Sequence, residues 1–383
     1  MDEHRARLDA LTGTRIFAAL AVFVFHAIGL GLIDERNTGL PLTYYARCLG
    51  PIGVEFFFVL SGFVLAWSAP AVIGYGRFVR RRLVKIYPNH LVGYLLALVV
   101  YAGFAVTWGI ALANLVLINA WWPDKIMVGG VNPPSWSLSV ELLAYLVFPL
   151  LLGAVRRIPG PRLWWACAGV LLAIWLMPVV ADRLPDHTRA PYPGPLAGEK
   201  VTALWFVHLF PPVRLLDFLL GILVAQLVRQ GRWPRIPVGL TVLFAAAWYG
   251  ISLFLPPLYA LTAAMAAPIA LLIGSLAAGE LRSGPGLAGG PVLRTLGEVS
   301  FAFYLLHYTV LVAVRLLTGG LDHPLTAGAG LLLLLGSLAS TLALSFVVYH
   351  LVEKPAMRYF AGPRPAGGRV APPASDRVGA RSV

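Results

Sequence analysis

The sequence predicts an all-α, polytopic integral membrane protein, and its composition and its long apolar runs are the two observations that predict it. Of its 383 residues, 58% are hydrophobic and only 12% are charged, and the mean hydropathy is +0.78. A soluble domain carries about 25% charged residues. Apolar runs of the length that a helix needs to cross a bilayer, about 20 residues, recur along the chain.

These runs predict about ten transmembrane helices. We expect them at 12–33, 52–70, 86–107, 138–155, 163–181, 208–228, 237–255, 258–278, 297–318 and 325–349. The apolar segment 109–120 is too short to span and is expected to be interfacial or re-entrant. The first run starts late and lacks a small-residue cleavage site, so it predicts a retained helix and not a signal peptide.

The basic residues predict that both chain ends are cytoplasmic. With the N-terminus inside, 22 of the 30 Lys and Arg residues fall in cytoplasmic segments, as the positive-inside rule requires. The net charge of +13 therefore indicates topology and not a nucleic-acid partner. We expect one transmembrane domain over 1–360, a disordered cytoplasmic tail over 361–383, rich in Gly, Pro and Arg, and a location in the cell (plasma) membrane.

Two ionisable residues interrupt the first apolar run, Arg15 near its start and His26 in its middle. Eleven positions separate them, which returns the side chain to within roughly 20° of the same helix face, about 16 Å further along the axis. An ionisable residue inside a span is costly and suggests function. The alternative for His26 is a ring satisfied by a neighbouring helix. Its position near the bilayer centre disfavours the charged form, so we expect a neutral ring.

Further ionisable residues lie in later spans. His307 is expected near the bilayer centre, where a hydrogen bond between helices is the alternative to a functional role. Glu141, expected near the outer face, is either a functional carboxylate or an acid at a helix N-terminus capped by Ser137 or Ser139. Arg214 and Asp217, three positions apart, predict a structural ion pair on one helix face.

A predicted cytoplasmic loop carries five cations within nine positions, namely Arg77, Arg80, Arg81, Arg82 and Lys85. Phosphate binding is one interpretation, because arginine forks match phosphate oxygens; a stop signal that sets orientation is the other. No Gly-rich loop ending in Lys-Ser or Lys-Thr is present, which argues against a nucleotide-driven motor. The two cysteines lack metal-ligand spacing, so no metal site is expected.

Six motifs in order resemble the membrane-bound acyltransferase family 3, the O-acyltransferases of OafA type. They are RIFAALAVFVFH from Arg15, GVEFFFVLSGF around Glu55, WSLSVE ending at Glu141, RLLDFLLG from Arg214, SFAFYLLH ending at His307, and VEKP around Glu353. The resemblance runs from Leu11 to Phe360. The opening stretch is most similar to actinobacterial members that acylate macrolide antibiotics and their sugars.

This resemblance implies transfer of an acetyl or other short acyl group from acyl-coenzyme A (acyl-CoA) at the cytoplasmic face, with no permanently bound cofactor. The acceptor it implies is a hydroxyl of a carbohydrate, a glycoside or a glycosylated natural product. We expect no further extracytoplasmic domain, which favours a small or lipid-linked acceptor over a long polymer.

The resemblance also implies roles for named residues. His26 would be the general base, and Arg15 with the cationic segment would hold the coenzyme A phosphates. Glu141 would orient the acceptor or His26, and His307 would be a second acid or base or bind the donor. The family's R-x-x-R motif is matched best by Arg82 to Lys85, with lysine in second place, or by Arg77 to Arg80.

A transporter or exporter of a glycoside is the competing interpretation. Histidines and carboxylates along a transmembrane path would suit it equally well. Transporters of this size more often show two related halves with broken helices, and the sequence shows no internal repeat.

Overall fold

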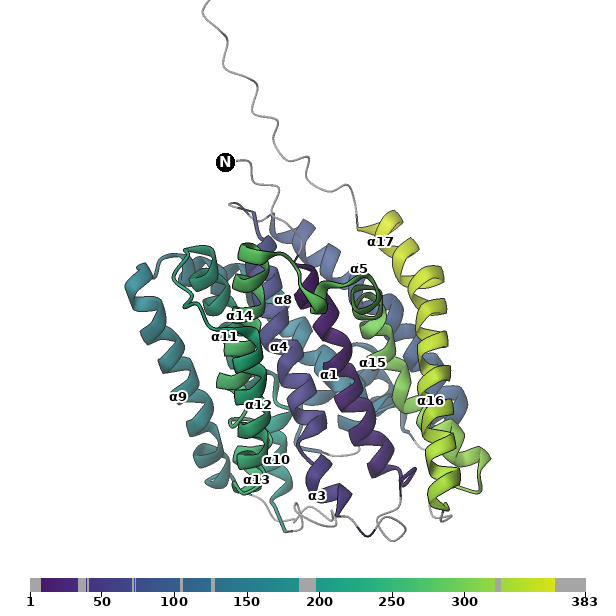
Figure 1. Cartoon of the computed structure of the whole chain (residues 1–383). Helices are drawn as coiled ribbons and strands as arrows, with labels where there is room; N and C mark the ends of the chain where they lie inside the picture. The colour runs from purple at the N-terminus through teal and green to yellow at the C-terminus, as the bar shows by residue number, and fades with distance from the viewer. Residues whose placement is uncertain are drawn as a thin grey trace, which may run out of the picture.

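The computed structural model describes residues 8–33, 39, 41–70, 72, 74–103, 106–124, 128–185, 198–320 and 325–361. All regular secondary structure in these residues is helical, and the helices stand side by side in one bundle (Figure 1). The predicted all-α class is confirmed. The expected disordered tail lies outside the described residues, apart from Ala361.

Eight helical segments in the described residues are long and apolar enough to cross a membrane. They are Asp9–Gly29, Leu42–Ser68, Tyr75–Ala102, Pro133–Arg156, Gly160–Asp182, Val201–Arg229, Pro291–Leu317 and Ala327–Phe360. The other two expected spans correspond to the shorter helices α12 and α14, Val238–Ser252 and Ala266–Ser283. The chain is thus a multi-pass membrane protein. The number of crossings and the cytoplasmic side of the termini stay predictions.

The N-terminal half contains four of the five helices that line the cavity described below, α1, α4, α5 and α8. Their bounds are α1 Asp9–Gly29, α3 Leu42–Ala46, α4 Leu49–Ser68, α5 Tyr75–Ala97 with a π-helical turn Leu98–Ala102, α6 Trp108–Leu115, η2 Asn119–Trp121, η3 Pro133–Ser135, α8 Trp136–Arg156, η4 Gly160–Arg162 and α9 Leu163–Asp182. The short α6 lies where an interfacial or re-entrant piece is expected.

The C-terminal half completes the bundle. Its elements are α10 Val201–His208, α11 Pro211–Arg229, α12, α13 Pro257–Ala260, α14, η6 Leu287–Gly289, α15 Pro291–Leu317, α16 Ala327–Val348, a π-helical turn Tyr349–Glu353, and α17 Lys354–Phe360. In Figure 1, the start of α1 and the helix α17 lie on the same side of the bundle, as an even number of crossings requires.

Three sequence-based boundaries are wrong. The cationic segment 77–85 is not a loop, because α5 begins at Tyr75. The expected span 208–228 is broken before Pro211, since proline lacks the N–H that would continue α10. The expected span 258–278 is interrupted between Ala260 and Ala266, and its main helix runs on to Ser283.

Glycines allow the central helices to approach closely. A Cβ atom on Gly62 of α4 would collide with the backbone carbonyl of Phe218 on α11, and one on Gly221 of α11 would collide with the carbonyl of Val59. Such small residues at helix contacts are typical of membrane bundles, where lipid supplies no hydrophobic drive between helices. The result is a tight central layer in which α4 packs against both α1 and α11.

The predicted ion pair on α11 is confirmed. Arg214 Nη2 lies 2.9 Å from Asp217 Oδ2, and the two side chains are only 2% and 1% exposed. Glu55 of α4 faces the same cluster and is also 1% exposed. Both partners of the pair lie on α11, and removing one of them would leave an uncompensated buried charge.

Candidate active site

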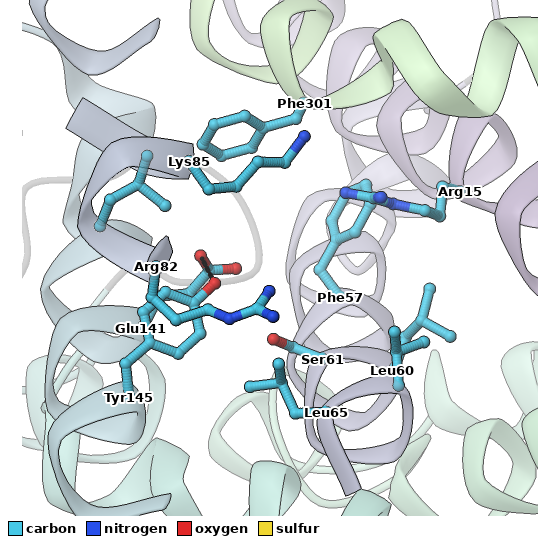
Figure 2. A pocket seen from close by; sticks show the side chains of 12 residues that line it. Arg15, Phe57, Leu60, Ser61, Leu65, Arg82, Lys85, Glu141, Tyr145 and Phe301 are labelled. Carbon is cyan, nitrogen blue, oxygen red and sulfur yellow. Dashed lines mark hydrogen bonds between the residues drawn. The ribbon is translucent and has the colours of Figure 1, made fainter. Parts of the chain in front are cut away.

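A cavity of about 110 Å³ lies among α1, α4, α5, α8 and α15. Figure 2 shows its side chains converging on one space from opposite walls. Its lining residues are Arg15, Phe57, Leu60, Ser61, Val64, Leu65, Arg82, Lys85, Ile86, Glu141, Tyr145 and Phe301. Several of the predicted site residues, far apart in sequence, therefore meet here.

The helical form of the cationic segment decides which of its residues reach this cavity. Arg82 and Lys85 are three positions apart and share one face of α5, which points into the cavity (Figure 2). Arg77 and Arg80 are exposed, and Arg80 Nε donates a hydrogen bond to the Phe360 carbonyl at 2.9 Å. Arg81 is half-buried and is also outside the cavity lining. The geometry thus favours Arg82 to Lys85 as the match to the family's R-x-x-R motif.

The three cavity cations differ in their ion pairing. Lys85 Nζ forms an ion pair with the buried carboxylate of Glu353, which also accepts a hydrogen bond from Asn89. Within the part of the chain that the structure describes, no carboxylate forms an ion pair with Arg15 or Arg82. These two guanidinium groups face the cavity from α1 and α5, and the Glu141 carboxylate in the same lining attracts both of them.

Glu141 does not lie near the outer face as expected, because its carboxylate lines the same cavity as Arg15 and Arg82. The alternative of an N-terminal capping acid is also wrong. Ser137 Oγ donates to the Pro134 carbonyl and Ser139 Oγ donates to Asn119, and neither caps the helix. Glu141 Oε2 instead accepts a hydrogen bond of 2.7 Å from Tyr145, one turn further along α8.

A second, smaller cavity adjoins the first and shares Arg15, Phe57, Glu141 and Phe301 with it. It extends to Tyr304 of α15, whose hydroxyl donates to the Pro134 carbonyl at 2.9 Å and lies 3.0 Å from Ser137 Oγ. The two cavities together extend from Arg82 and Lys85 of α5 to the face of α15 that carries Tyr304.

The two predicted histidines meet one turn beyond Tyr304. His307 Nε2 of α15 lies 3.1 Å from His26 Nδ1 of α1, and the ring centroids are 5.1 Å apart. His307 is fully buried and His26 is half-buried. Neither ring lines the two cavities; the ring of Tyr304, which lines the smaller one, lies 5.9 Å from the His307 ring between centroids. In the described residues, no third His, Cys, Asp or Glu joins them to form a group that could hold a metal ion.

Comparison with known proteins decides the family. Residues 8–350 match the acyltransferase domain of the membrane-bound acyltransferase family 3. The chain belongs to this family. It is 40% identical to acyltransferase MdmB of Streptomyces mycarofaciens over an alignment of 387 positions, which covers 97% of each chain. The chain is therefore a membrane acyltransferase.

Two further relatives are similar at lower identity. The exopolysaccharide production protein ExoZ of Rhizobium meliloti is 27% identical over 81% of this chain and 90% of its own length. The peptidoglycan O-acetyltransferase OatA of Listeria monocytogenes is 25% identical over 45% of this chain and 29% of its own length. No solved structure is significantly similar.

Sequence reasoning missed two residues that shape the site. Tyr145 could have been found, because it lies four positions after Glu141 on a predicted helix and must share its face. Glu353 was named from the sequence, but its partner was not. Its contact with Lys85 joins residues 268 positions apart, and no local pattern predicts such a contact.

Proposed function

We propose that this acyltransferase uses acyl-CoA as donor and that the cavity between α5 and α1 receives the coenzyme. The observation that supports this most is the pair of guanidinium groups, Arg15 and Arg82, which face the cavity and form no ion pair in the described residues, with one carboxylate, Glu141, in the same lining. Coenzyme A carries phosphates, and arginine binds phosphate oxygens through two parallel hydrogen bonds. The acyl end of the donor would then extend into the adjoining cavity, towards Tyr304.

The proposed chemistry is direct transfer. An acceptor hydroxyl attacks the thioester carbonyl carbon and its proton passes to the neutral ring of His26. The carbon–sulfur bond breaks, and the coenzyme leaves as a thiolate that takes up that proton. The products are an ester and free coenzyme A, so no oxidant, metal ion or protein nucleophile is needed. Glu141, beside Arg15 in the cavity, orients the reacting groups, and Tyr145 holds its carboxylate.

We propose a carbohydrate hydroxyl as the acceptor, on a small or lipid-linked glycoside or a glycosylated natural product. Two relatives, an exopolysaccharide production protein and a peptidoglycan O-acetyltransferase, support a saccharide. The Streptomyces acyltransferase, related over nearly the whole chain, supports the actinobacterial subgroup and thus a glycosylated natural product.

Purified protein in lipid nanodiscs tests this function. We expect free coenzyme A to appear when acetyl-CoA is mixed with a suitable member of a panel of glycosides, with an acetylated glycoside of matching amount by mass spectrometry. Empty nanodiscs and reactions without acceptor are the controls. Acylation found only on high-mass polysaccharide would contradict the proposed acceptor, and failure of several acyl-CoA chain lengths to react would contradict the proposed donor.

Arg82→Gln should raise the KM for acyl-CoA at least about tenfold while leaving kcat and the acceptor KM within a few fold. The physical reason is the loss of one charge-assisted contact to phosphate, worth about 1.5–3 kcal/mol. Initial rates over a range of donor concentrations measure the effect.

Arg77→Gln is the matched control for Arg82→Gln. It removes the same charge from the same helix, and so the same orientation signal, at an exposed position outside the cavity. Equal donor kinetics for the two variants, each inserted to the parental level, would leave the cationic segment with an orientation role alone.

A further inference from the structure

Two backbone carbonyl groups fix where the protons lie on the histidine rings. His307 Nδ1 lies 2.6 Å from the Tyr304 carbonyl oxygen, and His26 Nδ1 lies 3.0 Å from the Val22 carbonyl oxygen. A carbonyl oxygen can only accept a hydrogen bond, so each Nδ1 must carry the hydrogen. A neutral imidazole has one N–H, and therefore each Nε2 carries a lone pair.

The contact between the rings then has one direction. His26 Nδ1–H donates to His307 Nε2 across 3.1 Å and shares this hydrogen with the Val22 carbonyl. The lone pair of His307 is occupied by this bond. The lone pair on His26 Nε2 receives no hydrogen bond from a described residue, so it is the nitrogen that can accept a proton from outside the pair.

The surroundings of His307 hold it in this geometry. Its ring stacks on Phe303 with centroids 6.3 Å apart and an angle of 12° between the planes, and it is fully buried between α1 and α15. His26 is half-buried, and its ring meets Tyr308 edge-on at 5.1 Å. A buried, immobile ring that accepts one hydrogen bond is suited to orient its neighbour and not to meet a substrate.

We propose that His307 is a positioning residue, which holds His26 in the Nδ1–H tautomer so that His26 Nε2 is the base. The chain of hydrogen bonds runs from His26 Nδ1 to His307 Nε2, and from His307 Nδ1 to the Tyr304 carbonyl. When His26 Nε2 takes the hydroxyl proton, the ring becomes a cation, and its Nδ1–H bond to His307 strengthens. This inference rests on the proposed function for its chemical consequence, but the tautomers themselves do not depend on the donor or the acceptor.

The first experiment reads the tautomers without any substrate. Protein with ¹⁵N-labelled histidine is studied by solid-state NMR in lipid, and the His26 and His307 signals are assigned from the His26→Gln and His307→Gln variants. We expect protonated Nδ1 and unprotonated Nε2 in both rings. A His26 ring protonated at Nε2, or a charged ring at neutral pH, would overturn the proposal, even if the protein proves to be an acyl-CoA-dependent enzyme.

The second experiment asks which atom of His307 matters. In His307→Gln, Oε1 can take the place of Nε2 and accept from His26; in His307→Asn, the shorter amide falls short of it; in His307→Leu, no acceptor remains. We expect kcat to fall about 10- to 100-fold in the Asn and Leu variants, as for other residues that orient a reacting group. The Gln variant should recover to within about tenfold of the parent, and KM for acyl-CoA should stay within a few fold in all three.

Equal losses of kcat in the Gln, Asn and Leu variants would contradict the positioning role, as would a rise in donor KM without a fall in kcat. Thermal stability and donor binding, measured on the same preparations, separate these outcomes from misfolding. If the parent shows no acyl-CoA turnover at all, the proposed function fails. The NMR result still decides which nitrogen of each histidine carries the hydrogen.

Discussion

The His26→Ala variant should insert, fold and bind acyl-CoA, yet turn over at least about a hundredfold more slowly than the parent, because general base catalysis is typically worth about 10² to 10⁴ in rate. Alanine suits the first helix, and the half-buried ring leaves no large sealed cavity behind. Initial rates at saturating donor and acceptor measure the loss. Donor affinity should be unchanged by direct binding, since His26 is outside the cation-lined cavity.

Matched substitution of the second ring is the control for this result. His307→Ala removes the acceptor of the His26 hydrogen bond but leaves the proposed base in place, so its turnover should exceed that of His26→Ala. If His26→Ala stays within a few fold of the parent while His307→Ala abolishes turnover, the base has been assigned to the wrong histidine.

Arg214→Met should destabilise the bundle by about 3–5 kcal/mol, because it leaves the buried carboxylate of Asp217 without its cation. The free energy of unfolding in mixed micelles, followed by tryptophan fluorescence against added denaturing detergent, measures the effect. The cluster is outside the lining of both cavities, so donor KM of the folded fraction should stay close to the parental value.

The double variant Arg214→Met/Asp217→Leu is the control for the ion pair. It removes both charged partners and replaces them with apolar side chains, which is often neutral for a buried pair. We expect it to recover at least half of the loss in the single variant. A double variant that is less stable than Arg214→Met would show that the pair itself, and not the stranded charge, supplies the stability.

Much of the fold could be predicted because the bilayer imposes a simple rule, long apolar helices with satisfied backbones. The pairing of Arg214 with Asp217 was predictable for a similar reason, since a spacing of three places both on one helix face. The sequence-based errors lie where a helix passes the membrane edge. The five cations favour a loop at 77–85, but the segment is helical. Long basic side chains can extend their charged ends to water from one face of a helix while the other face packs on the bundle.

The site was predictable in its residues but not in its arrangement. Arg15 and His26 stood out because charge and imidazole are rare in spans. The depth of Glu141 was wrong because it was inferred only from the position of Glu141 near the start of its span. In the structure its side chain lines the same cavity as Arg15 and Arg82. The contact of His26 with His307 joins residues 281 positions apart in the sequence, and only the packing of α1 on α15 reveals it.

A structure of the protein in lipid with a non-hydrolysable thioether analogue of acetyl-CoA tests the central proposal most directly. We expect the coenzyme phosphates to contact Arg15 and Arg82, and the acyl end to pass the Glu141 carboxylate towards Tyr304 and His26. An analogue bound on another face of the bundle, or one whose acyl end points away from the two histidines, would contradict it.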